Sequence, residues 1–135
     1  MKITEENIAS IRGNLLALAG LSCLLYAGMA VAANQPDPFW WFVPGMMGLI
    51  AGAGTTLAFM MATPNVRRMA NDELYQQTMH RAQRHAFWIA MALYPVSAIA
   101  VVVFGLHWDT IFAVMGTLTG AAYLLLLTYY EWRQK

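Results

Sequence analysis

One stretch of the chain decides its fold: residues 86–106 read AFWIAMALYPVSAIAVVVFGL and contain no Asp, Glu, Lys or Arg. A run of about 20 apolar residues is long enough to cross a hydrocarbon core of about 30 Å as a helix. Similar uncharged runs occupy residues 14–33, 40–62 and 110–130. All of them are continuously apolar rather than alternating, which argues against the strands of a membrane barrel. The sequence therefore predicts an all-α, four-helix transmembrane bundle built as two like-oriented helical hairpins.

The basic residues indicate which side each end of the bundle faces. All eight Lys and Arg residues fall on one side of the four runs: Lys2, Arg12, Arg67, Arg68, Arg81, Arg84, Arg133 and Lys135. Short loops that carry Lys and Arg are retained in the cytoplasm. We therefore expect a multi-pass protein of the bacterial inner (plasma) membrane with cytoplasmic N- and C-termini.

The composition leaves little room for anything besides the bundle. Only 11% of the 135 residues are charged, against about 25% in a soluble domain, so we expect residues 1–135 to form a single integral membrane domain. The basic excess suits an anionic lipid surface but is too dilute for a nucleic-acid site. Cys23 has no second cysteine in this chain with which to form a disulfide. The first run is interpreted as a retained helix, because it is longer than the core of a signal peptide.

The longest exposed segment lies between the second and third runs, at residues 65–85, and is expected to be a cytoplasmic loop that leads into a helix. Asn71 can cap this helix, and Asp72 and Glu73 favour the positive end of its dipole. Pro95 should kink the helix within the membrane, because it removes one backbone hydrogen bond. The pattern predicts one long helix over residues 72–106 whose first turns project from the membrane.

Two of the runs share the small-residue motif Met-Gly-x-x-x-Gly-Ala. In each copy the two glycines lie one turn apart on one helix face, at Gly48 and Gly52 and again at Gly116 and Gly120. Such faces allow helices to approach closely in a membrane. We expect these glycines to serve helix packing and favour packing within one chain. Packing between copies stays open, as does the choice between internal duplication and chance.

The ionisable residues predict neither an enzyme nor a bound group. His80 and His85 are five residues apart on one predicted helix, so their side chains point in different directions. His107 belongs to the opposite membrane face. No ionisable residue lies well inside a run, which counts against a proton-coupled exporter. We therefore expect no catalytic, metal-ligating or cofactor-binding residues and no cofactor.

Tyr94, Ser97 and Tyr123 form the one intramembrane polar set that could face a ligand. Pro95 frees a backbone carbonyl in the same region. The competing interpretation is hydrogen bonding between helices, which contributes about 0.6 kcal/mol per contact in a membrane. We favour that interpretation.

A family resemblance is carried by three pairs along residues 72–88: Asp72-Glu73, Arg81-Ala82 and Ala86-Phe87. In this spacing the segment resembles a signature of small bacterial and archaeal four-helix membrane proteins of unknown function (DUF2178-like). Leu74 departs from that signature, because the family often has a basic residue there. The resemblance implies the four-span layout and brings no enzyme activity, cofactor or catalytic residue with it.

These patterns favour a non-enzymatic membrane accessory or regulatory protein that uses the projecting helix to contact a partner or lipid. Its partners would be membrane lipids and either a second copy of the chain or another membrane or cytoplasmic protein, with no nucleic acid. The residues expected near lipid phosphates are Arg67, Arg68, Arg81 and Arg84. The alternative is a small dimeric transporter, channel or lipophilic-ligand carrier lined by Tyr94, Ser97 and Tyr123. A third hypothesis is an enzyme that acts on lipid head groups through His80, Arg81 and Arg84.

Overall fold

The computed structural model describes residues 5–36, 41–70 and 72–133, and every regular element within them is a helix. The helices, in chain order, are α1 (Glu5–Ala33), α2 (Phe42–Met61), α3 (Pro64–Ala70), α4 (Glu73–Phe104) and α5 (Trp108–Arg133). Four spans within them are long and apolar enough to cross a membrane, with α3 and α4 together making up the third. The predicted all-α four-helix bundle is confirmed, and the chain is a multi-pass membrane protein.

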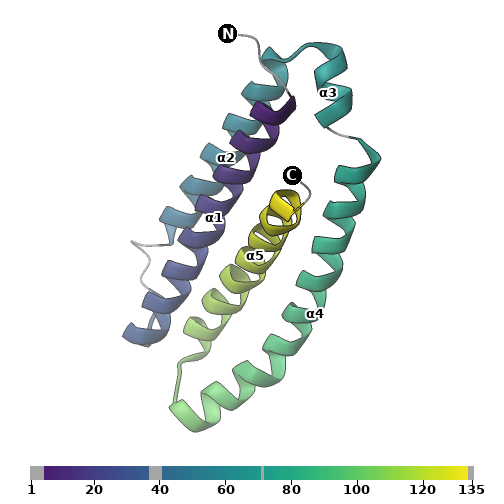
Figure 1. The fold of residues 1–135 in the computed structure, drawn as a ribbon. Coiled ribbons are helices and arrows are strands. Elements are labelled where there is room, and N and C mark those ends of the chain that lie inside the picture. Colours follow the sequence, from purple (N-terminus) through teal and green to yellow (C-terminus); the bar gives the residue numbers. More distant parts are fainter. Residues whose placement is uncertain (1–4, 37–40, 71, 134–135) are drawn as a thin grey trace.

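The four long helices pack in the order α2, α1, α5, α4, as Figure 1 shows. The helices α1 and α5 form the inner pair, α2 lies against α1, and α4 lies against α5. Between α1 and α5 a small core collects around Tyr26, Ala27, Ala30 and Val114. Each consecutive pair of long helices, α1 with α2 and α4 with α5, is therefore one hairpin, and the two hairpins meet along the inner pair.

The two ends of the bundle differ in what they contain. One end, here called the terminal end, holds the start of α1, the short helix α3, the start of α4 and the end of α5 (Figure 1). The opposite end, here called the loop end, holds residues 34–36 and 105–107. At the terminal end Ile8 of α1 packs with Ala62, Phe59 and Val66, which ties α1 to the end of α2 and to α3.

The segment after α2 is more ordered than the sequence predicts. Residues 65–70 belong to α3 rather than to a loop. Pro64 is the first residue of that helix, a position where a missing backbone N–H costs nothing. The long helix α4 is confirmed at Glu73–Phe104, but its cap is Asp72, whose carboxylate accepts a hydrogen bond from the Tyr75 backbone N–H at 2.9 Å. The predicted cap, Asn71, lies outside the described residues.

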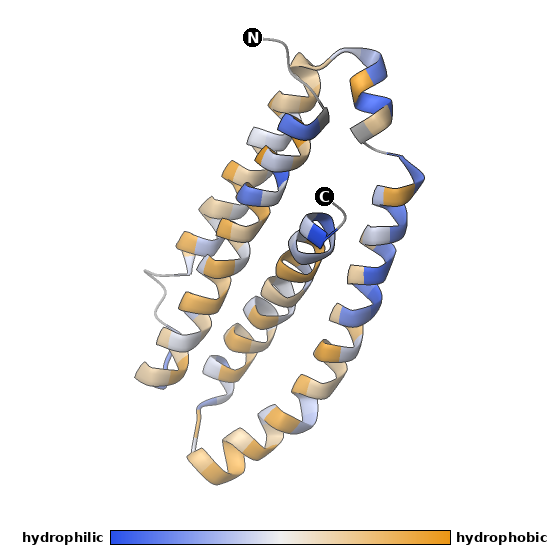
Figure 2. Cartoon of the chain, viewed as in Figure 1, coloured by the Kyte–Doolittle hydropathy of each residue, from blue (hydrophilic) through white to orange (hydrophobic). Residues whose placement is uncertain are grey.

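The course of α4 agrees with its sequence. It contains Pro95 and ends at Gly105, which adopts the left-handed conformation (φ 64°) common at helix C-termini. In Figure 1 its second half curves toward the loop end. Figure 2 shows hydrophilic residues along α3 and the first half of α4, and hydrophobic residues along the second half. The first turns of α4 therefore form a polar extension of an apolar span.

Close helix packing within the chain uses different glycines from those predicted. A Cβ atom at Gly48, Gly52, Gly116 or Gly120 would meet no described atom within 4 Å. A Cβ at Gly20 of α1 would instead lie 2.8 Å from Leu125 Cγ, and one at Gly54 of α2 would lie 2.8 Å from Leu15 Cδ1. These four glycines are therefore not positions of close helix contact within the described part of one chain. The reason is that α2 turns the face carrying Gly54 toward α1 and leaves Gly48 and Gly52 exposed.

Candidate functional site

A buried ion pair joins the two inner helices at the terminal end. Arg12 Nη2 of α1 lies 2.6 Å from Glu131 Oε1 of α5, and the two side chains are only 8% and 6% exposed. Two opposite charges withdrawn from water attract each other strongly, but each also loses its hydration. Such a pair in a membrane bundle is a candidate for function or for fixing helix register. It is the most unusual polar feature of the described chain.

Arg12 also contacts the third helix of this end. Its guanidinium carbon lies 3.7 Å from the centre of the Tyr75 ring, within the range of a cation–π contact. Tyr75 lies in the first turn of α4, the turn that the Asp72 cap holds in place. One guanidinium therefore connects α1, α4 and α5.

The backbone of α1 comes very near α5 at this point because residue 13 is glycine. A Cβ there would lie 3.2 Å from Trp132 Nε1 and 3.5 Å from Glu131 Oε2. The Thr128 hydroxyl also donates a hydrogen bond of 3.4 Å to the Gly13 carbonyl. Gly13 thus gives Glu131 the room to reach Arg12 between the two helices.

Sequence reasoning missed this pair because it treated both residues as flanking the apolar runs. The helices extend beyond those runs, so α1 already includes Arg12 and α5 still includes Glu131. The available signal was one basic residue just before the first run and one acid just after the last. The charge pattern puts both residues on the same side of the four runs.

The first turns of α4 have one buried and one exposed face. Thr78, Ala82 and Ala86 are 2%, 0% and 5% exposed, at the spacing of three to four residues that keeps side chains on one helix face. Small side chains at these positions allow α4 to lie close to α5. The opposite face carries exposed polar residues, here called the polar face of α4: Glu73, Gln77, His80 and Arg84.

A second contact between α4 and α5 lies beside the polar face. The guanidinium carbon of Arg81 is 5.0 Å from the centre of the Tyr130 ring. The Tyr130 hydroxyl lies 3.4 Å from His85 Nδ1, which in turn is 2.8 Å from the Arg81 carbonyl oxygen. Arg81 and Tyr130 also border a small hollow of about 110 Å³. Arg81, expected near lipid phosphates, thus stacks on an aromatic ring of its own chain.

The other predicted arginines divide into two kinds. Arg67 donates hydrogen bonds to the Ala62 carbonyl (3.0 Å) and the Met60 carbonyl (2.6 Å), so it satisfies carbonyls at the C-terminal end of α2. Arg68 and Arg84 are exposed. Arg67 and Arg81 are exposed as well, so what sets them apart is their contacts with carbonyls and with the Tyr130 ring.

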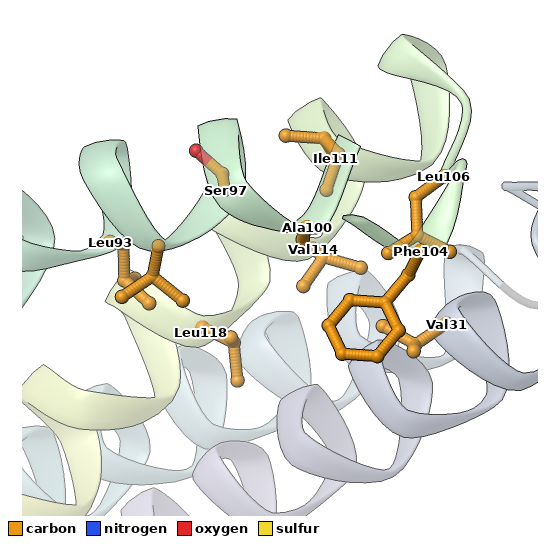
Figure 3. A pocket seen from close by; sticks show the side chains of 10 residues that line it. Val31, Leu93, Ser97, Ala100, Phe104, Leu106, Ile111, Val114 and Leu118 are labelled. Atoms are coloured by element: carbon orange, nitrogen blue, oxygen red, sulfur yellow. The ribbon is translucent and has the colours of Figure 1, made fainter. Parts of the chain in front are cut away.

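The predicted set of Tyr94, Ser97 and Tyr123 is not brought together around one cavity. Ser97 lines a cavity of about 530 Å³ between α1, α4 and α5, shown in Figure 3, and neither tyrosine is among its lining residues. Tyr94 is largely exposed on α4. The Ser97 hydroxyl donates a hydrogen bond of 2.8 Å to the Tyr94 carbonyl within its own helix. Among the described residues, these three side chains therefore share neither a hydrogen bond between helices nor a cavity.

Metal binding has no support within residues 5–36, 41–70 and 72–133, where no three His, Cys, Asp or Glu side chains gather closely enough to hold an ion. His85 lies within the first half of α4, whereas His107 lies beyond the end of that helix, at the loop end of the bundle. The geometry at the terminal end is one of helix attachment, since the buried charges contact each other and Tyr75.

The fold and the buried pair define a class, an all-α multi-pass membrane protein whose inner helices share an ion pair. Comparison with known proteins goes no further, because no family model, curated protein or solved structure matches the chain. The resemblance of residues 72–88 to the DUF2178-like signature stays a prediction.

Proposed function

We propose that this chain is a non-enzymatic accessory or regulatory protein of the bacterial inner membrane, with both termini in the cytoplasm. In this orientation the terminal end, with α3 and the first turns of α4, faces the cytoplasm. The one-sided placement of Lys and Arg supports that direction. The working surface in this proposal is the polar face of α4.

The observation that carries the proposal is the attachment of α4 on one side only. Its buried face, Thr78, Ala82 and Ala86, packs on the bundle, and Arg12 stacks on Tyr75 in its first turn. A helix held in this way presents its opposite face in a fixed geometry. Ordering a surface before binding lowers the entropic cost of association.

The chemistry of the polar face suits a protein partner at a membrane surface. It combines the acidic Glu73, the amide of Gln77, the imidazole of His80 and the basic Arg84 along one line. A surface that combines hydrogen-bonding groups with charges of both signs recognises another polar protein surface better than a uniformly anionic lipid surface. Exposed Arg68 and Arg84 would in addition face lipid phosphates.

The test is native mass measurement of the protein extracted from its own membranes in mild detergent. We expect the chain to be recovered with a second protein or a second copy of itself. The double variant His80→Ala/Arg84→Ala should lose that associate, whereas Arg68→Ala, which also removes an exposed arginine, should keep it. Exposed substitutions of this kind change the free energy of unfolding by no more than about 0.5 kcal/mol, so loss of the associate would not reflect unfolding.

Two results would contradict the proposal. One is a wild-type chain recovered only as a monomer without associated protein. The other is an associate that all three proteins retain equally, which would place the contact elsewhere on the molecule.

A further inference from the structure

One described cavity lies in the apolar half of the bundle, away from the polar face of α4. Its volume is about 530 Å³, within the range of about 300 to 1,000 Å³ typical of small-molecule sites. Figure 3 shows Leu93 and Leu118 near one end of it, and Phe104, Leu106 and Val31 near the other. The walls come from the second half of α4, the first half of α5 and the end of α1.

The lining offers a polar ligand little to bind. Ser97 contributes the one polar side chain among the lining residues. Its hydroxyl already donates to the Tyr94 carbonyl at 2.8 Å. A water molecule inside would need two to four polar partners to be stable. The cavity therefore selects hydrocarbon.

The surroundings of the cavity match an amphiphile. Val96 and Phe104 line it and are also exposed, so the cavity opens at the lipid-facing side of α4. Leu106 at its loop end is followed by a polar junction, where the Asn34 side chain accepts from the His107 backbone N–H (3.0 Å) and donates to the Gly105 carbonyl (3.3 Å). His107 and Trp108 are exposed beside that junction. The apolar cavity matches the hydrocarbon part of a lipid, and the polar junction at the membrane boundary matches its head group.

We propose that this cavity binds one hydrocarbon chain of a membrane amphiphile, with the polar group of that amphiphile at the Asn34–His107 junction. The hydrocarbon chain of the ligand enters between α4 and the inner pair of helices, with its tip toward Leu93 and Leu118. The binding site is separate from the polar face of α4 and does not depend on it. What holds the chain is van der Waals contact with the walls, because transfer from lipid to protein brings no hydrophobic gain.

The experiment uses the full chain in lipid nanodiscs that contain a fatty acid with a photoactivatable diazirine. A diazirine at the tip of the acyl chain should label peptides around Leu93 and Leu118. A diazirine next to the carboxyl group should instead label peptides around Leu106 and Val31. Equal labelling by the two probes along every exposed helix would overturn the proposal, because it would reflect bulk lipid alone.

A matched pair of variants separates the cavity from the general lipid surface. Ala100→Phe places a ring in the cavity, whereas Val102→Phe places the same ring on a neighbouring residue that is 84% exposed. We expect Ala100→Phe to lower labelling of the cavity peptides about tenfold and Val102→Phe to leave it unchanged. Ser97→Leu fills the same space and serves if Ala100→Phe fails to fold. Unchanged labelling in a folded cavity-filling variant would overturn the proposal, as would a cross-linked dimer whose cavity peptides contact a second copy instead of the probe.

Discussion

At the scale of single residues, the Arg12–Glu131 pair has the greatest effect on the bundle. Its side chains are almost fully buried and bring α1, α4 and α5 together at one point. Removing one member leaves the other charge buried without its main counterion, which costs about 3 to 5 kcal/mol. Removing both members removes the buried charge as well.

We therefore expect strong coupling between the two positions. Arg12→Met and Glu131→Leu should each lower the free energy of unfolding by about 3 kcal/mol, and the double variant should recover most of that loss. The measurement is the midpoint of denaturant-induced unfolding in detergent, followed by the fluorescence of the chain's tryptophans. The exposed variant Arg68→Met controls for loss of an arginine. Additive losses in the double variant would mean that the pair does not act as a unit.

Two glycines should change the stability of the protein in opposite directions when each is replaced by alanine. Gly20→Ala would place a Cβ 2.8 Å from Leu125 Cγ and 2.9 Å from Leu125 Cδ2. Crowding of this kind costs about 1 to 3 kcal/mol. Gly116→Ala meets open space and should stabilise its helix by up to about 1 kcal/mol. Thermal unfolding of the two variants should shift in opposite directions, and a shift in the same direction would contradict the close contact at Gly20.

At the scale of elements, α4 is the helix that the sequence predicts best. Its length follows from an acidic first turn and from the lack of a helix breaker before Pro95. The short helix α3 was not predicted, because seven residues provide too little periodicity for a pattern to stand out. The helices α1 and α5 also reach beyond the uncharged runs at residues 14–33 and 110–130. An uncharged run marks where lipid surrounds a helix, but a helix continues past lipid wherever its neighbours can satisfy the charges.

The start of α4 depends on its cap. Asp72→Ala removes the acceptor of the Tyr75 backbone N–H and should cost about 0.5 to 2 kcal/mol. Because Tyr75 stacks on Arg12, we expect fraying to spread to that contact. Hydrogen exchange of the amides in residues 73–78 should then become faster. Asp72→Asn keeps a capping oxygen and should exchange like the native chain, and faster exchange in both variants would mean that charge rather than capping holds this turn.

At the scale of the whole molecule, the order of the helices could not be read from the sequence. The runs establish how many spans there are, and the charges predict their direction, but every span is apolar on all sides. Which faces meet depends on local detail, such as the crowding at Gly20 and Gly54 beside the open space at Gly48. The candidate site was hidden for the same reason, because Arg12 and Glu131 become neighbours only once α1 lies against α5.

That order of helices has a consequence for how the protein is made. The main partner of α1 is α5, yet synthesis delivers α2, α3 and α4 before it. During that interval Arg12 has emerged and Glu131 has not, so the ion pair between their side chains cannot yet form. Insertion of the final span completes the pair. The last span to be made is therefore the one that completes the inner pair, so the two ends of the sequence meet at the centre of the bundle.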